Sequence, residues 1–264
     1  MRARRLVVAL PKGGSGKTAT AVAFAWALQQ RRKRVLLVDL DPQAHSAAAV
    51  GVDLSEVTYR VGDWLLDRGA PFAPTVVSPF LHVVPSAPQD AGLDRSVEKE
   101  SHDVGPILVR SALDRVEDRY DYIICDCPPN LGAVAYSALL SGPVLAPVEM
   151  NRLAVSTVPT LIDSLARLRR GGWNVSLLAL LPTKCRERTM EFRESLELLG
   201  EMTKPGNHRI TRARIPAATA IARSLAESKT LFGAEYRTSR GPSAYAAALR
   251  EVVHLLEKEA SHGC

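Results

Sequence analysis

The sequence predicts an α/β fold in which a mostly parallel central sheet carries helices on both faces. Beta-rich apolar segments alternate with helical patterns nearly throughout the 264 residues, an order typical of parallel sheets with helical crossovers. Several apolar segments are continuous rather than alternating, as strands buried on both faces are. A glycine-rich segment, PKGGSGKTAT at Pro11–Thr20, lies between the first predicted strand and the first predicted helix.

Seven strands are expected from the apolar pattern. The six clearest are Arg5–Leu10, Arg34–Leu40, Phe80–Pro85, Tyr120–Asp126, Pro143–Val148 and Val175–Pro182. A further short strand is expected around Ile210–Ile215.

Helical patterns fill most of the intervals, at Lys17–Gln30, Gly105–Glu117, Val155–Arg169, Thr189–Leu199 and Ser243–Glu259. Apolar residues recur at helical spacing in the last of these, which predicts a helix that packs on the core. Two polar segments, Asp90–Asp103 and Arg237–Pro242, are expected to be exposed loops rather than domain linkers. The whole chain, residues 1–264, is therefore expected to form a single domain.

Composition limits the kind of protein. The formal net charge is +6 and the sequence pI is about 9.3, which favours a polyanionic partner such as nucleic acid or an anionic membrane. No segment approaches the roughly 18–20 apolar residues of a membrane span, so a cytoplasmic protein is expected. Four cysteines are few for a secreted scaffold, and Cys125 and Cys127 are expected to be buried thiols.

The glycine-rich segment has the chemistry of a phosphate-binding loop. Its end matches the pattern G-x-x-x-x-G-K-[ST], although Pro11 stands where that pattern has its first glycine. Three glycines, at positions 13, 14 and 16, can adopt positive φ and let backbone N–H groups converge on phosphate oxygens. Lys17 would then reach the β and γ phosphates, and the Thr18 hydroxyl would ligate magnesium. The order of strand, loop and helix predicts the P-loop NTPase fold.

Carboxylates follow two of the predicted strands. LLVDLDPQ places Asp39 and Asp41 at the end of the second strand, and YIICDCPP places Asp126 at the end of a later one. In open parallel sheets ligands bind beyond the carboxyl ends of the strands. These three acids are therefore expected to converge on the edge where the loop lies and to serve magnesium and water.

Three motifs together resemble a known family. KGGSGKT, VDLDPQ and YDYIICDCPPNLG are similar to the deviant Walker A, Walker A-prime and Walker B motifs of the ParA/Soj partitioning ATPases, relatives of MinD and of the nitrogenase iron protein. The similarity continues more weakly through LLPTKCRERT, IPAATAIARSLAESKTLFG and GPSAYAAALREV. The resemblance implies a Mg²⁺-dependent ATP hydrolase that dimerises on ATP, binds DNA nonspecifically at the nucleoid and works with a ParB-like centromere-binding protein.

The resemblance also implies roles for individual residues. Lys12 would act across the dimer on the partner's ATP, comparable to an arginine finger, while Lys17 serves its own. Asp41 would orient the attacking water, Asp39 would lie near the magnesium shell, and Asp126 would hold magnesium through water. Adenine would contact Thr183 and Pro216. The implied nucleotide contacts from the loop are Lys12, Gly13, Gly14, Ser15, Gly16, Lys17, Thr18 and Ala19.

Basic residues cluster late in the chain. Lys204–Arg250 holds nine lysines and arginines against two acids, Glu227 and Glu235, which fits phosphate-backbone contacts without base reading. A solvated basic face is the alternative. The expected DNA-binding residues are Arg209, Arg212, Arg214, Arg223 and Arg240. Two positions depart from the family, Ala44 in place of glycine and Ala217 in place of an arginine that contributes to DNA binding in relatives.

Other functions of the same superfamily remain open. The main alternative is a MinD-like membrane-associated positioning ATPase, although Glu251, Glu257 and Glu259 make the C-terminal helix unlike a basic membrane-binding one. A metabolic ATP-dependent amidase or synthetase is a third class. An iron–sulfur cluster is not expected, because Cys125 and Cys127 flank the Walker B acid. Only eleven residues precede Lys12, so no N-terminal helix-turn-helix domain is expected.

Overall fold

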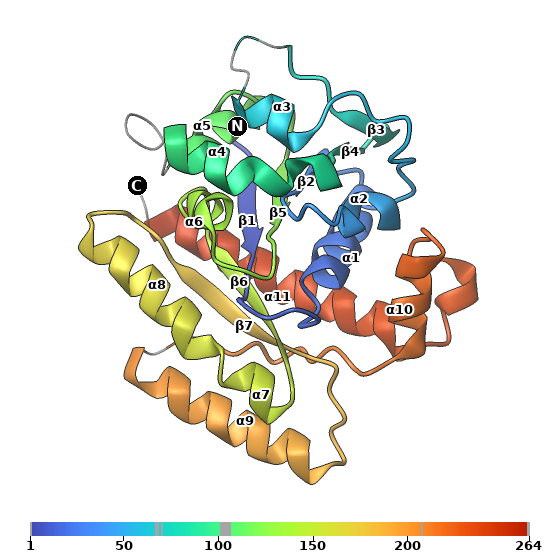
Figure 1. The fold of residues 1–264 in the computed structure, drawn as a ribbon. Helices are drawn as coiled ribbons and strands as arrows, with labels where there is room; N and C mark the ends of the chain where they lie inside the picture. The colour runs from blue at the N-terminus through green and yellow to red at the C-terminus, as the bar shows by residue number, and fades with distance from the viewer. Residues whose placement is uncertain (1, 67–68, 70, 101–106, 207, 263–264) are drawn as a thin grey trace.

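The computed structural model describes residues 2–66, 69, 71–100, 107–206 and 208–262. Its centre is a seven-stranded sheet with the order β3-β4-β2-β5-β1-β6-β7 (Figure 1). All neighbouring strands are parallel except β3 and β4, which pair antiparallel at one edge. The strands are β1 Arg4–Val8, β2 Val35–Asp39, β3 Thr75–Ser78, β4 Leu81–Val84, β5 Tyr122–Asp126, β6 Val144–Glu149 and β7 Leu177–Thr183.

Helices cover both faces of this sheet, as the sequence predicts. Side chains alternate along each strand, so Leu6 and Val8 of β1 enter one apolar core while Val7 and Ala9 enter the other. The first core contains α1 Lys17–Gln29, α2 His45–Ala49, α10 Thr219–Ala226 and α11 Arg240–His262, and α1 lies beside α11 (Figure 1). The second contains α3 Val61–Leu66, α4 Leu93–Glu100, α5 Leu108–Asp114, α6 Ala133–Leu139, α7 Arg152–Val155, α8 Val158–Arg170 and α9 Met190–Thr203.

Four single turns of 3₁₀ helix complete the described elements: η1 Pro88–Gly92, η3 Glu117–Arg119, η4 Lys204–Gly206 and η5 Ala234–Tyr236. The six clearest predicted strands are all confirmed, with ends shifted by at most two residues. The expected helix Val155–Arg169 is two helices, because Pro159 begins a new first turn after Thr157. The expected helix Gly105–Glu117 is observed as α5, Leu108–Asp114. Residues 105 and 106 lie outside the described ranges.

Three expectations about elements were wrong. The segment Ile210–Ile215 forms one isolated bridge with β7, between Ile210 and Leu180. A bend in which the Thr211 hydroxyl donates to the Ala213 carbonyl interrupts further pairing. The expected loop Asp90–Asp103 contains η1 and α4 up to Glu100, with residues 101–103 outside the described ranges. The expected loop Arg237–Pro242 includes the start of α11 at Arg240, since proline is tolerated in a first helical turn.

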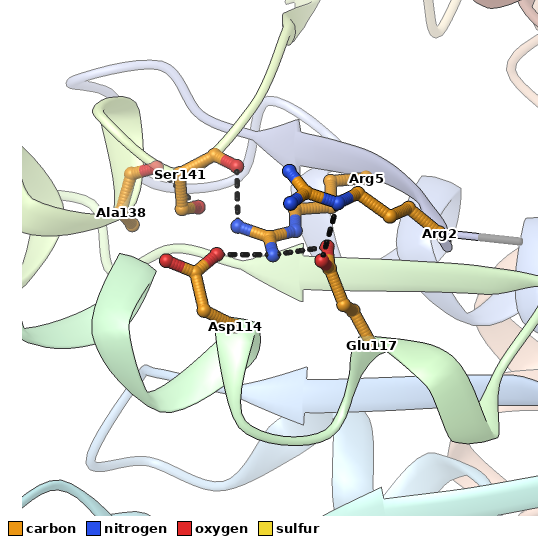
Figure 2. Close-up of polar contacts among 6 residues, drawn as sticks. All are labelled: Arg2, Arg5, Asp114, Glu117, Ala138 and Ser141. Carbon is orange, nitrogen blue, oxygen red and sulfur yellow. Dashed lines mark hydrogen bonds and ion pairs between the residues drawn. The ribbon is translucent and has the colours of Figure 1, made fainter.

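Arg5 anchors the amino end of the inner strand β1. Arg5 of β1 is 11% exposed and forms ion pairs with Asp114 and Glu117, and it also donates to the carbonyl of Ser141 (Figure 2). Arg2 pairs with Glu117 from the other side at 3.1 Å. These contacts fix β1 against the ends of α5 and α6. They lie at the amino end of β1, whereas the glycine-rich loop follows its carboxyl end. The carboxyl end of β1 is thereby positioned to lead into that loop.

Candidate functional site

The loop between β1 and α1 has the backbone that phosphate binding requires. Gly14 (φ 73°) and Gly16 (φ 96°) lie in the left-handed region, where a side chain would add strain. Gly16 is the N-cap of α1, so the amino end of that helix opens directly on the loop. Gly13 is not in this region, so two of the three loop glycines use the positive φ that glycine allows.

Lys17, the first residue of α1, is buried at 6% exposure. Its Nζ donates to two carbonyl oxygens of the loop, that of Lys12 at 2.8 Å and that of Leu10 at 3.2 Å. Burial lowers the pKa of the Lys17 ammonium, and the charge of Asp126 opposes that shift. The side chain is thus held inside the turn by neutral acceptors that an anion can replace.

Asp39, the last residue of β2, has both carboxylate oxygens engaged. One accepts from the backbone N–H of Ser46 (3.1 Å) and Ala47 (3.0 Å) at the start of α2. The other accepts from the N–H of Asp41 at 3.2 Å. Burial raises the pKa of Asp39 to about 6 against the effect of these hydrogen bonds. Its contacts therefore position α2 and Asp41.

Asp126, the last residue of β5, is as buried as Asp39 but differs from it in its hydrogen bonding. Neither carboxylate oxygen has a hydrogen-bond partner of ordinary geometry among the described residues, although the Thr18 hydroxyl lies near enough to favour the ionised form. Burial, and next the charge of Asp39, raise the pKa of Asp126 well above its usual value. An unpartnered buried carboxylate is costly unless a cation compensates it. The pair Asp126 and Thr18 therefore fits Mg²⁺, which takes one or two protein oxygens together with substrate phosphates.

No group of three or more acidic, histidine or cysteine side chains that would hold a metal alone is found in the described ranges. Cys125 and Cys127 are buried free thiols in the same apolar core, as predicted.

A cavity of about 750 Å³ opens beside the loop. The predicted site residues on its wall are Gly13, Gly14, Gly16, Lys17, Thr18, Ala19, Asp41, Thr183 and Pro216. Asp41 accepts from the N–H of Gln43 at 3.0 Å. The Thr183 hydroxyl donates to the carbonyl of Ser15 at 2.7 Å, so it also holds the loop against the end of β7.

Four other predicted residues do not line this cavity: Lys12, Ser15, Asp39 and Asp126. Ser15, Asp39 and Asp126 are buried behind its wall. Lys12 is half-buried, and within the described ranges its ammonium forms no ion pair. Sequence reasoning missed Lys184, Arg186 and His45, which also line the cavity.

A second cavity of about 770 Å³ adjoins the first and is called the basic groove here. Its charged lining residues are Arg186, Glu187, Arg188, Arg214 and Arg240. Arg186 and the segment Pro216–Ala218 line both cavities. The sequence analysis missed Arg186 and Arg188, although the segment CRER, read with its charges, was a signal for them.

The five expected DNA-binding arginines differ in their surroundings. Arg214 pairs with Glu187 at 3.4 Å and lies over the ring of Phe192. Arg223 pairs with Glu227. The other three, Arg209, Arg212 and Arg240, are exposed and form no ion pair with any described residue. Only Arg214 and Arg240 line the basic groove.

This fold and this loop define a nucleotide-binding P-loop protein, and an AAA domain family matches residues 3–177 of the chain. The sporulation initiation inhibitor protein Soj of Bacillus subtilis (strain 168) is 31% identical over 248 residues, which cover 91% of this chain and 94% of that protein. The chromosome-partitioning ATPase Soj of Thermus thermophilus is 31% identical over 256 residues, 96% of each chain. The chain belongs to the ParA/Soj-type ATPases, which are partitioning and positioning ATPases.

Solved structures agree with this fold. Apo McdA from a Cyanothece species superposes with a TM-score of 0.83 at 19% identity, covering 94% of this chain and 98% of that one. A cobyrinic acid a,c-diamide synthase from Mycobacterium smegmatis, solved with bound ADP and magnesium, gives a TM-score of 0.76 at 26% identity over 94% and 93%. In the part of this chain that the structure describes, no helix is long and apolar enough to cross a membrane.

Proposed function

We propose that residues 1–264 form one Mg²⁺-dependent ATPase domain that converts ATP and water to ADP and phosphate and dimerises on ATP. The ATP-bound dimer binds DNA nonspecifically at the nucleoid of the cytoplasm. Together with a ParB-like centromere-binding partner it partitions or positions chromosome or plasmid DNA. The observation that carries the catalytic part is Asp126, a buried carboxylate that lies near Thr18 and Lys17 and finds no donor of ordinary geometry among the described residues.

Each residue near the loop has a role in this proposal. Backbone N–H groups of residues 13–19 and the Lys17 ammonium bind phosphate oxygens. Asp41 holds the attacking water, and Thr183 and Pro216 form the wall against the adenine. Mg²⁺, when bound by Thr18 and Asp126 with Asp39 behind them, neutralises charge on the β and γ phosphates. The Lys12 ammonium, which forms no ion pair with a described residue, contacts the ATP of the partner subunit, so nucleotide binding and subunit pairing are one event.

The basic groove supports the DNA-binding part of the proposal. It holds four arginines against one glutamate, which suits phosphate contacts of any sequence. It also adjoins the nucleotide cavity through Pro216–Ala218. Closure of two subunits over ATP would bring two such grooves into one continuous surface, which makes DNA binding depend on ATP.

Two other functions are less well supported. A MinD-like role on membranes is not favoured, because the relatives that match nearly the whole chain are Soj proteins. An ATP-dependent amide synthase has support from the 26% identical diamide synthase structure. Turnover that requires a small-molecule carboxylic acid and ammonia donor, without any stimulation by DNA, would favour that function.

Co-sedimentation with DNA and with anionic liposomes tests the proposal. The protein is mixed with either in the presence of ADP, ATP or a nonhydrolysable ATP analogue. We expect it to pellet with DNA of any sequence in ATP and the analogue, not in ADP, and not with liposomes in any state. Lys17→Ala is the control that should lose the ATP effect. Pelleting with liposomes in ATP, or equal DNA binding in all three nucleotide states, contradicts the proposal.

A further inference from the structure

Lys184 has a backbone conformation that its residue type disfavours. It directly follows β7 and has φ 49°, one of four non-glycine residues with positive φ in the described part of the chain. Side chains other than glycine, asparagine and aspartate are strained in this left-handed region. Such strain is concentrated at functional sites, where the surrounding structure holds it in place. Lys184 also lines the nucleotide cavity.

The Lys184 side chain reaches the glycine-rich loop. Its Nζ lies 3.8 Å from the point where a β-carbon on Gly14 would stand. It also donates to Oε2 of Glu149 at 3.3 Å. Glu149 is the last residue of β6, and its register partner on β7 is Thr183, the neighbour of Lys184. The ammonium therefore lies between a carboxylate at the end of one strand and the backbone that would hold phosphates.

The ion pair alone does not account for this arrangement. The Lys184 side chain is 48% exposed and that of Glu149 is 24% exposed, and pairs of this kind contribute little to stability because water screens them. A glycine at position 184 would relieve the backbone strain. The weak ion pair with Glu149 therefore does not explain why a lysine stands there. A cation beside Gly14 does gain from an anion in the cavity, because charge-assisted contacts to phosphate are stronger than contacts between neutral groups.

We propose that Lys184 is a phosphate-binding cation for the nucleotide of its own subunit, and that Glu149 competes with the phosphates for it. Without nucleotide the ammonium pairs with Glu149. When a nucleoside di- or triphosphate enters, the ammonium contacts phosphate oxygens beside Gly14 and leaves Glu149. Glu149 thereby lowers the affinity for nucleotide. This inference rests on the proposed ATP site and adds to it a third cation beyond Lys12 and Lys17.

A double-mutant cycle tests this competition. Binding of fluorescently labelled ADP and ATP in Mg²⁺ is measured by fluorescence polarisation for Lys184→Gln, Glu149→Gln and the double variant. We expect Lys184→Gln to weaken binding about tenfold, the size of one charge-assisted contact, and to lower its salt dependence. Glu149→Gln should tighten binding a few-fold when Lys184 is present. In the Lys184→Gln background it should have no effect.

Two further variants separate charge from folding. Lys184→Gly removes both the cation and the backbone strain, so it should weaken nucleotide binding while the protein unfolds at the same or a higher urea concentration. Lys33→Gln changes an exposed lysine just before the amino end of β2, away from the glycine-rich loop. This variant should bind nucleotide as the wild type does. Wild-type affinity in Lys184→Gln overturns this inference alone. Failure of the wild type to bind either nucleotide overturns the proposed function.

Discussion

Asp39 and Asp126 are register partners on the adjacent strands β2 and β5, yet their carboxylates are in opposite states. Asp39 accepts three backbone hydrogen bonds, whereas the oxygens of Asp126 find no donor of ordinary geometry among the described residues. Burial raises the pKa of both, and the charge of Asp39 raises that of Asp126 further. The site thus holds a destabilised negative charge where magnesium is expected.

Asp126→Asn is therefore expected to stabilise the protein without nucleotide, by about 1–3 kcal/mol at pH 7.5, since it removes a buried charge that only Lys17 and Thr18 offset in part. The pKa of Asp126 is higher in the folded than in the unfolded protein, so the cost of its charge is greatest above the folded pKa, declines as pH falls from the folded toward the unfolded pKa, and is gone below the unfolded pKa. The gain should shrink at pH 5.5. Urea unfolding at both pH values measures it.

The matched control for that variant is Asp39→Asn. An amide in place of this carboxylate replaces one accepting oxygen by a donor that faces backbone N–H groups, so it should destabilise the protein. Equal stabilisation by both substitutions would show that the hydrogen bonds of Asp39 do not distinguish the two acids. Asp126→Asn should also weaken Mg²⁺-dependent nucleotide binding.

Asp41→Ala is expected to abolish ATP turnover and to leave ATP-dependent dimerisation intact. Asp41 lines the cavity, and its carboxylate accepts one hydrogen bond among the described residues, from the N–H of Gln43, so loss of this side chain should disturb little structure. Phosphate release gives the turnover, and light scattering after size-exclusion chromatography gives the mass with and without ATP. A variant that stays monomeric in ATP contradicts a purely catalytic role.

Lys12→Gln is expected to lose both dimerisation and hydrolysis while it still binds nucleotide. The Lys12 carbonyl, which accepts from Lys17, is unaffected by this change, so the loop should keep its shape. Fluorescence polarisation with labelled ATP checks binding, and light scattering checks association. Wild-type association by this variant would mean that the ammonium acts only within its own subunit.

Arginines that form no ion pair are expected to contribute most to DNA binding. Arg212→Gln with Arg240→Gln should lower DNA affinity and reduce the slope of log affinity against log salt by about two, because each substitution leaves one DNA phosphate without its cation. Arg214→Gln with Arg223→Gln removes cations already paired with Glu187 and Glu227 and should have a smaller effect. Affinity measured across a salt series distinguishes the pairs, and equal losses would contradict this ranking.

Arg32→Gly is expected to stabilise the protein by about 0.5–1 kcal/mol. Arg32 has φ 55° and follows α1 in a Schellman turn, in which its N–H donates to Gln29 and that of Lys33 donates to Leu28. Glycine is favoured at this position. Arg31→Gly, in the same exposed turn, lacks positive φ and should not stabilise. Thermal unfolding of both variants decides between them.

The parts of this molecule that local sequence encodes were predictable. The loop glycines and the acids at strand ends are contiguous motifs, and buried parallel strands have continuous apolar runs. The strand β3, with the short sequence TVVS, lacks such a run. The helix α4 could not be predicted from its sequence LDRSVEKE, because Leu93 and Val97 are its only apolar residues.

Contacts between distant segments could not be predicted in this way. The bond between Thr183 and Ser15 joins residues 168 positions apart. The basic groove gathers arginines from the segment after β7, from the segment before α10 and from α11. Lys184 was missed because neither its left-handed backbone nor its approach to Gly14 leaves a trace in the residue pattern.

The segment Pro216–Ala218 lines both the nucleotide cavity and the basic groove. A ligand that contacts this segment from the nucleotide cavity therefore contacts residues that also line the basic groove. Coupling between two binding sites is equal in both directions. If bound nucleotide raises the affinity of the basic groove for a polyanion, the bound polyanion raises the affinity for nucleotide by the same factor.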